Sequence, residues 1–377
     1  MTELASQNVE VPMNDLRVQY EQIKPQIDAA LAGVVENCSF ILGPQVEGFE
    51  EAFADYNDVK HCIGVSNGTD ALKLALRAAN IGEGDEVITT SFTFGATVEA
   101  ICDVGARPVF ADIHEAYFTL DVDQVKNRIT NKTRAIIPVH IYGQVADMEP
   151  LLALAAEHDL KIIEDAAQAQ GARYKEYLAG SLGHMGCFSF YPGKNLGAYG
   201  DAGGLITDDD GLAAELRLLR NHGQDPQRKF NYRGIGYNHR MDGFQGAVLQ
   251  VKLPYLDTWN KRRRRVADRY NEGLKDVDAL ILPAEAEYAY HVYHLYVVRV
   301  SGREEFGAEL KREGISTAVQ YPYALHLTDA YAHLGYKEGA LPVTEKACQE
   351  IISLPLYPDL LDQQVDYVVE KVRRYFR

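Results

Sequence analysis

Cysteine is scarce in this sequence, and its arrangement excludes two kinds of structure. Only five cysteines occur among 377 residues, they are scattered, and no two form a C-x-x-C pair. Disulfide frameworks and structural zinc sites need paired or clustered cysteines. We therefore expect reduced thiols, no metal site and a cytoplasmic location.

Long hydrophobic runs and excess basic charge are also missing. No run of about 18 apolar residues is present, and the N-terminus MTELASQNVEVPMNDLRVQY lacks the apolar core of a secretory signal. The formal net charge is −16 at pH 7. Because nucleic acids and anionic membranes attract basic surfaces, we expect neither as a partner.

The glycine motifs of nucleotide-binding loops are absent as well. The sequence has neither G-x-x-x-x-G-K-[ST] nor G-x-G-x-x-G. Its glycine-rich stretch SFYPGKNLGAYGDAGG (189–204) precedes a predicted strand instead of opening a helix. A nicotinamide-dependent oxidoreductase is therefore not favoured.

What the sequence does contain is a regular alternation of short Val- and Ile-rich runs with helical patterns. Helices are predicted between the first five strands of a series at 61–65, 85–90, 107–113, 134–141, 160–166, 186–191 and 203–209. This alternation predicts an α/β fold with a mostly parallel sheet flanked by helices. Ligands of such sheets bind at the carboxyl ends of the strands.

The pattern changes after about residue 243. Residues 244–274 predict long helices interrupted near Pro254, and a strand (291–300) and two helices (303–314, 363–376) follow. We predict a large domain with an N-terminal arm at residues 1–255 and a smaller α+β domain at residues 256–377.

Two predicted strand ends could hold a phosphate and a charged ring. Gly68 and Thr69 lie between a strand and a helix, where free backbone N–H groups suit a phosphate, although simple helix capping explains them too. Asp165 ends a strand, where its carboxylate could meet a cationic ligand atom, and Gln168 could reach the same ligand. The alternative for Asp165 is also helix capping.

An aromatic side chain and a lysine complete the set. Phe92 and Phe94 follow a strand and could stack on a planar ligand or pack in the core. Lys194 lies in the glycine-rich stretch, where a poorly solvated amine could form a Schiff base, although an ordinary loop lysine is the alternative. A phosphate cradle, a stacking ring, a carboxylate and an amine are together what pyridoxal 5′-phosphate requires.

These motifs resemble the DegT/DnrJ/EryC1/StrS family of pyridoxal-phosphate nucleotide-sugar aminotransferases, which have the fold-type I architecture of aspartate aminotransferase. The resemblance covers nearly the whole chain and includes SNGTDALKLAL, GDEVITTSFTFGAT, IIEDAAQAQGA, SFYPGKNLGAYGDAGG and GYNHRMDGFQGAVLQVKL. It implies a large sheet domain and a smaller C-terminal domain.

The resemblance also implies a role for each residue of the cofactor site. Lys194 would bind the cofactor covalently, Asp165 would pair with its ring nitrogen, Gln168 would bond its phenolic oxygen, and Phe94 would stack on the ring. The phosphate would be held by Gly68, Thr69, Ser189 and, from a neighbouring subunit, Asn238. The active unit would then be a homodimer with shared sites.

The same family implies an amino-acid donor, usually glutamate, and a nucleotide-linked keto sugar as acceptor. The phrase HGQDPQRKFNYRGIGYN (222–238) resembles the branch that acts at C3, although NHRMD stands where NSRLD is commoner. A 4-keto aminotransferase, a sugar dehydratase and a regulatory homologue are the alternatives. The dehydratase branch has histidine where Lys194 stands, which argues against it.

Five further features could contact the substrate. His326, Tyr321, Arg240 and His140 are candidates, with packing as the alternative for His326 and Tyr321 and a structural role as the alternative for His140. The basic run KRRRRVADR (261–269) could meet the nucleotide diphosphate, but a solvated helix face explains it better.

Overall fold

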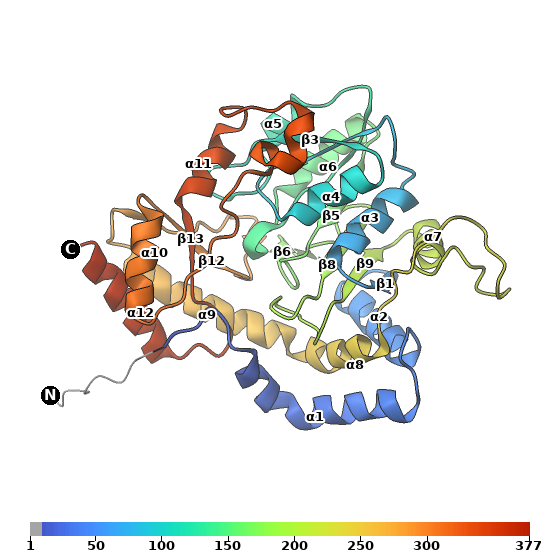
Figure 1. Cartoon of the computed structure of the whole chain (residues 1–377), viewed down its shortest axis with the longest axis horizontal. Coiled ribbons are helices and arrows are strands. Elements are labelled where there is room, and N and C mark those ends of the chain that lie inside the picture. The colour runs from blue at the N-terminus through green and yellow to red at the C-terminus, as the bar shows by residue number, and fades with distance from the viewer. Residues whose placement is uncertain (1–9) are drawn as a thin grey trace.

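The centre of the molecule is a seven-stranded sheet with the order β1-β9-β8-β5-β4-β2-β3 (Figure 1). This computed structural model describes residues 10–377. Strands from β8 to β3 run parallel, and β9 is antiparallel to both its neighbours, which confirms the predicted mostly parallel sheet. The strands are β1 (His61–Val65), β2 (Glu86–Thr90), β3 (Arg107–Ala111), β4 (Thr133–Ile136), β5 (Lys161–Asp165), β8 (Met185–Ser189) and β9 (Gly203–Thr207).

Helices cover both faces of this sheet because consecutive strand residues point to opposite sides. Within β5, Ile162 packs in the layer that contains α2, α6 and α8, whereas Ile163 packs in the layer that contains α3, α4 and α7. The helices of the large sheet are α2 (Pro44–Tyr56), α3 (Gly68–Ala78), α4 (Gly95–Asp103), α5 (Val122–Lys126), α6 (Met148–Glu157), α7 (Asp210–Arg220) and α8 (Gly243–Lys252).

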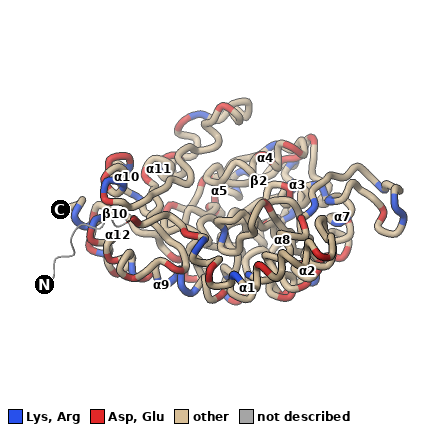
Figure 2. The backbone as a smooth tube through the Cα atoms, turned by 60° about the horizontal axis from the view of Figure 1, so that its bottom comes forward, with Lys and Arg blue, Asp and Glu red and all other residues tan. Residues whose placement is uncertain are grey.

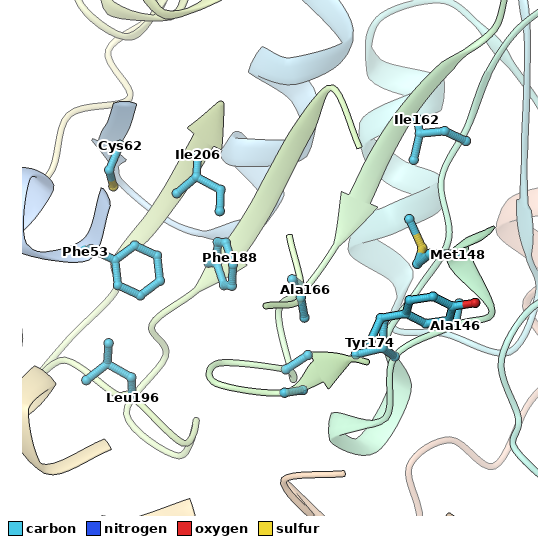
Figure 3. Close-up of a cluster of buried hydrophobic side chains, with 14 of the residues drawn as sticks. Phe53, Cys62, Ala146, Met148, Ile162, Ala166, Tyr174, Phe188, Leu196 and Ile206 are labelled. Carbon is cyan, nitrogen blue, oxygen red and sulfur yellow. The ribbon is translucent and has the colours of Figure 1, made fainter. Parts of the chain in front are cut away.

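Aromatic side chains fill the layer under α2. Phe53 lies against Phe188 of β8 with their rings edge to face and the centroids 5.1 Å apart (Figure 3). Both side chains are fully buried. Each such ring removes a large apolar surface from water, and this packing fixes β8, whose carboxyl end leads into the segment of Lys194.

The C-terminal part is a smaller α+β unit. Its antiparallel sheet has the order β10-β12-β13, and the long helix α9 connects it to the large sheet (Figure 1). The elements are α9 (Leu256–Leu274), β10 (Leu280–Ile281), β12 (Tyr296–Val300), α10 (Arg303–Arg312), α11 (Pro342–Glu350), β13 (Ile351–Leu354) and α12 (Asp362–Tyr375). The division at residue 255 stays a prediction.

Short elements join these two parts. At the N-terminal side, Val11 pairs with Ile315 of the smaller unit, and α1 (Leu16–Glu36) then lies along α8. A minor sheet has the order β11-β6-β7, formed by Ala289–Tyr290, Arg173–Tyr174 and Tyr177–Leu178. The 3-10 turns are η1 (Ile141–Gly143), η2 (Leu253–Tyr255), η3 (Leu325–Leu327) and η4 (Asp329–Leu334).

Two predicted strands are shorter in the structure than the sequence suggested. The strand expected at 134–141 is β4, which ends at Ile136 before Pro138, a residue without the N–H that a central strand needs. The strand expected at 291–300 begins only at Tyr296. Tyr293 has a φ of 44°, which interrupts extended backbone, so residues 291–295 form an irregular segment.

Charge is spread over the surface. Figure 2 shows acidic and basic positions interspersed along the chain, with several basic residues in the loop that follows α7. Within residues 10–377, no helix has the length and apolar character needed to cross a membrane.

Candidate active site

A cavity of about 660 Å³ opens at the carboxyl ends of the parallel strands. Residues that follow or end β1, β2, β4, β5 and β8 form one wall, and the smaller unit supplies the other. This is where an open parallel sheet binds its ligands. Nine of the predicted residues line it: Gly68, Thr69, Phe94, His140, Asp165, Gln168, Ser189 and Lys194 from the large unit, and Tyr321 from the smaller unit.

Lys194 reaches this cavity from the loop after β8. Its backbone N–H donates to the carbonyl of Tyr191 (2.8 Å), which fixes a tight turn at the lysine. The side chain is half-buried and forms no salt bridge with any residue from 10 to 377. Because burial disfavours the charged amine, the pKa of Lys194 falls to about 8, although nearby Asp165 opposes the shift.

Asp165 is a buried carboxylate at the end of β5. It accepts hydrogen bonds from the hydroxyl of Thr97 (2.7 Å) and the N–H of Ala167 (3.2 Å). Burial raises the pKa of Asp165, and these two hydrogen bonds oppose the shift. A buried carboxylate without a paired cation is costly, so the site suits a cationic ligand atom.

Gln168 is held in a fixed orientation. Its Oε1 accepts the backbone N–H of Tyr142 (2.7 Å), which leaves the amide nitrogen as the donor group. That nitrogen donates to the hydroxyl of Tyr321 (3.3 Å). Gln168 and Tyr321 therefore form a linked pair in the cavity wall, with one residue from each side of the cleft.

The turn at Gly68 passes very close to Ser189. A Cβ built on Gly68 would lie 2.7 Å from the Cβ of Ser189, a distance that no side chain tolerates. Glycine is therefore required there, and it brings the first N–H groups of α3 beside the Ser189 hydroxyl. Such a helix start favours an anion.

The structure distinguishes between the two phenylalanines. Phe94 is 59% exposed and lines the cavity, with its ring 5.7 Å from that of Tyr321. Phe92 is 1% exposed and stacks on Phe118 in the core, with ring centroids 5.5 Å apart. Of the two, only Phe94 is placed to meet a ligand.

Two of the predicted histidines are committed to internal hydrogen bonds. His140 is fully buried, accepts the N–H of Ala146 at Nδ1 (3.1 Å) and donates from Nε2 to Glu164 (2.8 Å). His326 does not line the cavity. Its ring lies between Ser91 (2.8 Å) and Glu345 (3.1 Å), so neither histidine offers a free nitrogen.

Arg240 and Asn238 lie outside this chain's own cavity. Arg240 donates to Asn221 (3.2 Å), and exposed Asn238 pairs with Asn221 through the backbone. Both belong to the segment that follows α7, which extends away from the rest of the molecule (Figure 1).

Several cavity residues were not predicted from the sequence, and Thr97, His294 and Arg263 are the polar ones that matter most for the site. Thr97 follows Phe94 by three positions on α4 and contacts Asp165, as its position at the start of that helix could have indicated. His294 lies in the segment that was predicted to be a strand. Arg263 lies on the buried face of α9, four residues after Trp259 and four before Ala267, so helical periodicity could have identified it.

Comparison with known proteins identifies the family. The model of the DegT/DnrJ/EryC1/StrS aminotransferase family matches residues 21–373. The chain belongs to this family. It is therefore a pyridoxal-phosphate-dependent aminotransferase.

Individual members of the family are similar over their full length. A "Pleiotropic regulatory protein" of Geobacillus stearothermophilus is 50% identical, over 97% of this chain and 99% of that protein. The "dTDP-3-amino-3,4,6-trideoxy-alpha-D-glucose transaminase" of Streptomyces venezuelae is 44% identical, over 97% of this chain and 96% of that protein. A crystal structure of DesV from S. venezuelae has a TM-score of 0.95 and 44% identity, covering 98% of this chain and 99% of that one.

The cavity of this family member fits pyridoxal phosphate. The close approach of Gly68 to Ser189 places the start of α3 beside this serine, and a helix start suits a phosphate. Asp165 is a buried carboxylate that needs a cationic partner, and Lys194 is an amine that is partly uncharged near neutral pH. Phe94 presents a ring to the same cavity.

Proposed function

We propose that this aminotransferase moves an amino group from an amino acid, glutamate in particular, to the C3 keto group of a nucleotide-linked sugar. The observation that carries the proposal is that the low-pKa amine of Lys194 and the buried carboxylate of Asp165 line one cavity. The sugar and the C3 position are supported by the name of the S. venezuelae relative, a 3-amino sugar transaminase, and by the resemblance of residues 222–238 to the C3 branch.

Lys194 carries the proton transfers in this proposal. When bound, pyridoxal phosphate supplies an aldehyde that takes up the amino group and a ring that accepts an electron pair. Lys194 would hold the cofactor through its aldehyde, and the donor amine would release the lysine side chain. The freed amine of Lys194 would take the proton from the donor's α-carbon and deliver it to the cofactor's former aldehyde carbon, acting first as base and then as acid. A pKa of about 8 suits both directions.

The other residues bind and orient. Asp165 keeps the ring nitrogen protonated, and Gln168, held by Tyr142, donates to the phenolic oxygen. Phe94 covers one ring face, and Gly68, Thr69 and Ser189 hold the phosphate. Tyr321 is the substrate candidate that the geometry supports, because its hydroxyl lies in the cavity on the side of the smaller unit.

We also propose a homodimer in which each site borrows Asn238 from the second copy, and Arg240 with it. The segment after α7 carries Phe230, Tyr232 and Ile235, which are 71%, 57% and 92% exposed. Large exposed apolar side chains on a projecting loop are typical of a contact surface. A cytoplasmic location is proposed as well, since all five cysteines are free thiols.

The alternatives are less well supported. A sugar dehydratase of this family would lack Lys194, and a 4-keto aminotransferase is not indicated by the 3-amino sugar relative. The G. stearothermophilus relative is named for a regulatory role, but regulation does not require an amine with its pKa lowered to about 8.

One experiment separates these possibilities. The cofactor-loaded protein is first mixed with L-glutamate. After the donor is removed, 3-keto or 4-keto nucleotide sugars are added, and the products are identified by mass spectrometry. We expect 2-oxoglutarate from the first step and a 3-amino sugar from the second. A 4-amino product would indicate the 4-keto aminotransferase instead, and a dehydrated sugar would indicate the dehydratase.

A further inference from the structure

The basic run of α9 contains one arginine that differs from its neighbours. Arg262 pairs with Asp359 (2.8 Å) and Arg264 with Glu285 (2.6 Å). Further along, Arg265 pairs with Asp362 (3.3 Å) and Arg269 with Asp366 (2.6 Å). Arg263 alone among these five arginines has no carboxylate partner within residues 10–377.

Arg263 is also the most deeply buried of the five, with an exposed fraction of 3%. Its Nη1 donates to three backbone carbonyls, those of Tyr293 (3.3 Å), His294 (3.2 Å) and Leu356 (3.2 Å). Its Nε is buried and has no hydrogen-bond partner in the described part of the chain. A buried guanidinium with an unused N–H is costly unless a ligand completes it.

The unused edge of Arg263 is the edge that binds carboxylates elsewhere in this molecule. Arg269, on the same helix, donates from Nε and Nη2 to the two oxygens of Asp366 (2.7 and 2.6 Å). In Arg263 the three hydrogen bonds all come from Nη1, so within residues 10–377 neither Nε nor Nη2 donates to a partner. A planar guanidinium edge matches a carboxylate with two parallel hydrogen bonds.

Arg263 lines the same cavity as Lys194, next to His294 and Leu356. Burial lowers the pKa of Arg263 to about 10, so the guanidinium is still charged at neutral pH. His294 adds no charge, because burial and the nearby cations Lys194 and Arg263 hold its pKa well below the usual range. Among the described lining residues, Arg263 is therefore the one fixed cation besides the reactive lysine.

We propose that Arg263 binds the α-carboxylate of the amino-acid donor through its Nε–Nη2 edge. The inference rests on the proposed aminotransferase function and assigns the donor its own subsite. Every amino-acid donor carries this carboxylate on the carbon that loses its proton. Fixing it against Arg263 therefore orients the α-carbon toward Lys194 whichever side chain the donor has.

The test compares Arg263→Met and Arg263→Lys with a matched control, Arg265→Met. The control removes one positive charge from an exposed position of the same helix. Each cofactor-loaded protein is titrated with L-glutamate, with L-glutamine, which lacks the γ-carboxylate, and with isoglutamine, which lacks the α-carboxylate. The apparent Kd is read from the single-turnover change of the cofactor spectrum, and the melting temperature checks the fold.

We expect Arg263→Met to raise the Kd for glutamate and glutamine roughly 10- to 100-fold, the usual effect of losing a charge-assisted hydrogen-bond pair. The Kd for isoglutamine should not change, Arg263→Lys should recover part of the loss, and Arg265→Met should behave as wild type. An equal loss with isoglutamine, no loss with glutamate, or a loss confined to the keto-sugar step would each overturn the proposal.

A binding measurement that needs no reaction keeps this test separate from the proposed function. Calorimetric titration with glutarate, an unreactive dicarboxylate, should show binding to the wild-type holoprotein that is at least about 10-fold weaker in Arg263→Met. If glutarate binds through Arg263 but glutamate never converts the cofactor, the transaminase proposal fails and the carboxylate site stands. If both Arg263 variants bind glutarate as the wild type does, the carboxylate site fails.

Discussion

At the scale of single residues, Lys194 illustrates how a reactive site opposes stability. Its amine has an ordinary pKa of 10.5 and a pKa of about 8 in the folded chain. Below pH 8 the folded protein therefore carries a partly buried charge that the unfolded chain would carry in water. At about 1.4 kcal/mol per unit of pKa difference, the lost stability amounts to at most ~3 kcal/mol.

Replacing this lysine should therefore stabilise the cofactor-free protein. We expect Lys194→Met to raise the free energy of unfolding by up to ~3 kcal/mol at pH 7. The gain should shrink as the pH rises from 8 to 10.5, because the folded chain then releases its proton before the unfolded chain does. Urea denaturation at pH 7 and pH 10.5 measures it, and equal stability of the two proteins at pH 7 would contradict the lowered pKa.

Thr97 is predicted to support Asp165. Its hydroxyl is the side-chain donor to that carboxylate, so Thr97→Val leaves a buried oxygen without its hydrogen bond. We expect cofactor affinity to fall about 10-fold, in line with the loss of one hydrogen bond to a charged group. Equilibrium dialysis measures this, and Thr97→Ser, which keeps the hydroxyl, should bind normally. A normal affinity in the Val variant would exclude the supporting role.

The sequence predicted those cavity residues that stand at the ends of strands. Asp165 is recognisable because strand periodicity and the parallel-sheet rule place it at the carboxyl edge of the sheet. Lys194 was recognisable from its glycine-rich loop, and the role of Ser189 from the family resemblance. Arg263 was assigned to a solvated face because four consecutive arginines obscure which one points inward. Its place on the same helix face as Trp259 and Tyr270 becomes decisive only when the packing of α9 is known.

At the scale of elements, the junction between β8 and α3 determines the phosphate cradle. Gly68→Ala would place a Cβ 2.7 Å from that of Ser189, so α3 must shift away from the strand. We expect cofactor affinity to fall at least about 10-fold with the fold retained. Gly33→Ala in α1 is the matched control, because a Cβ there meets nothing within 4 Å. Fluorescence titration with pyridoxal phosphate measures the affinity of each variant for the cofactor. Equal affinities of Gly68→Ala and Gly33→Ala would contradict a phosphate site at Gly68.

The sequence also predicted most elements of the large sheet, since its strands and helices follow clear periodicities. It failed at residues 291–295, where Val292 and Tyr293 are apolar enough for a strand. The side chain of His291 accepts the N–H of Tyr293 (3.0 Å), and the left-handed backbone at Tyr293 turns the segment toward the cavity. A side chain that bonds its own backbone competes with strand pairing, and local periodicity does not reveal this.

At the scale of the whole molecule, shared sites predict complementation between two inactive proteins. Lys194→Ala and Asn238→Ala dimers should each have little activity. After mixing and exchange of subunits, about a quarter of wild-type activity should return, because half the dimers are mixed and each has one site with both native residues. Activity assays after mild dissociation test this. No recovery, with exchange proven by mass spectrometry, would mean that Asn238 acts within its own chain or not at all.

The proposed function requires that the cavity around Lys194 transfers nitrogen from an amino acid to a nucleotide-linked 3-keto sugar. The most direct measurement incubates the holoprotein with ¹⁵N-labelled L-glutamate and a 3-keto nucleotide sugar, then locates the label by mass spectrometry and NMR. We expect ¹⁵N on C3 of the sugar with wild-type protein and no labelled sugar with Lys194→Ala. Label on the sugar at the wild-type rate with Lys194→Ala, or none with the wild-type protein, would contradict it.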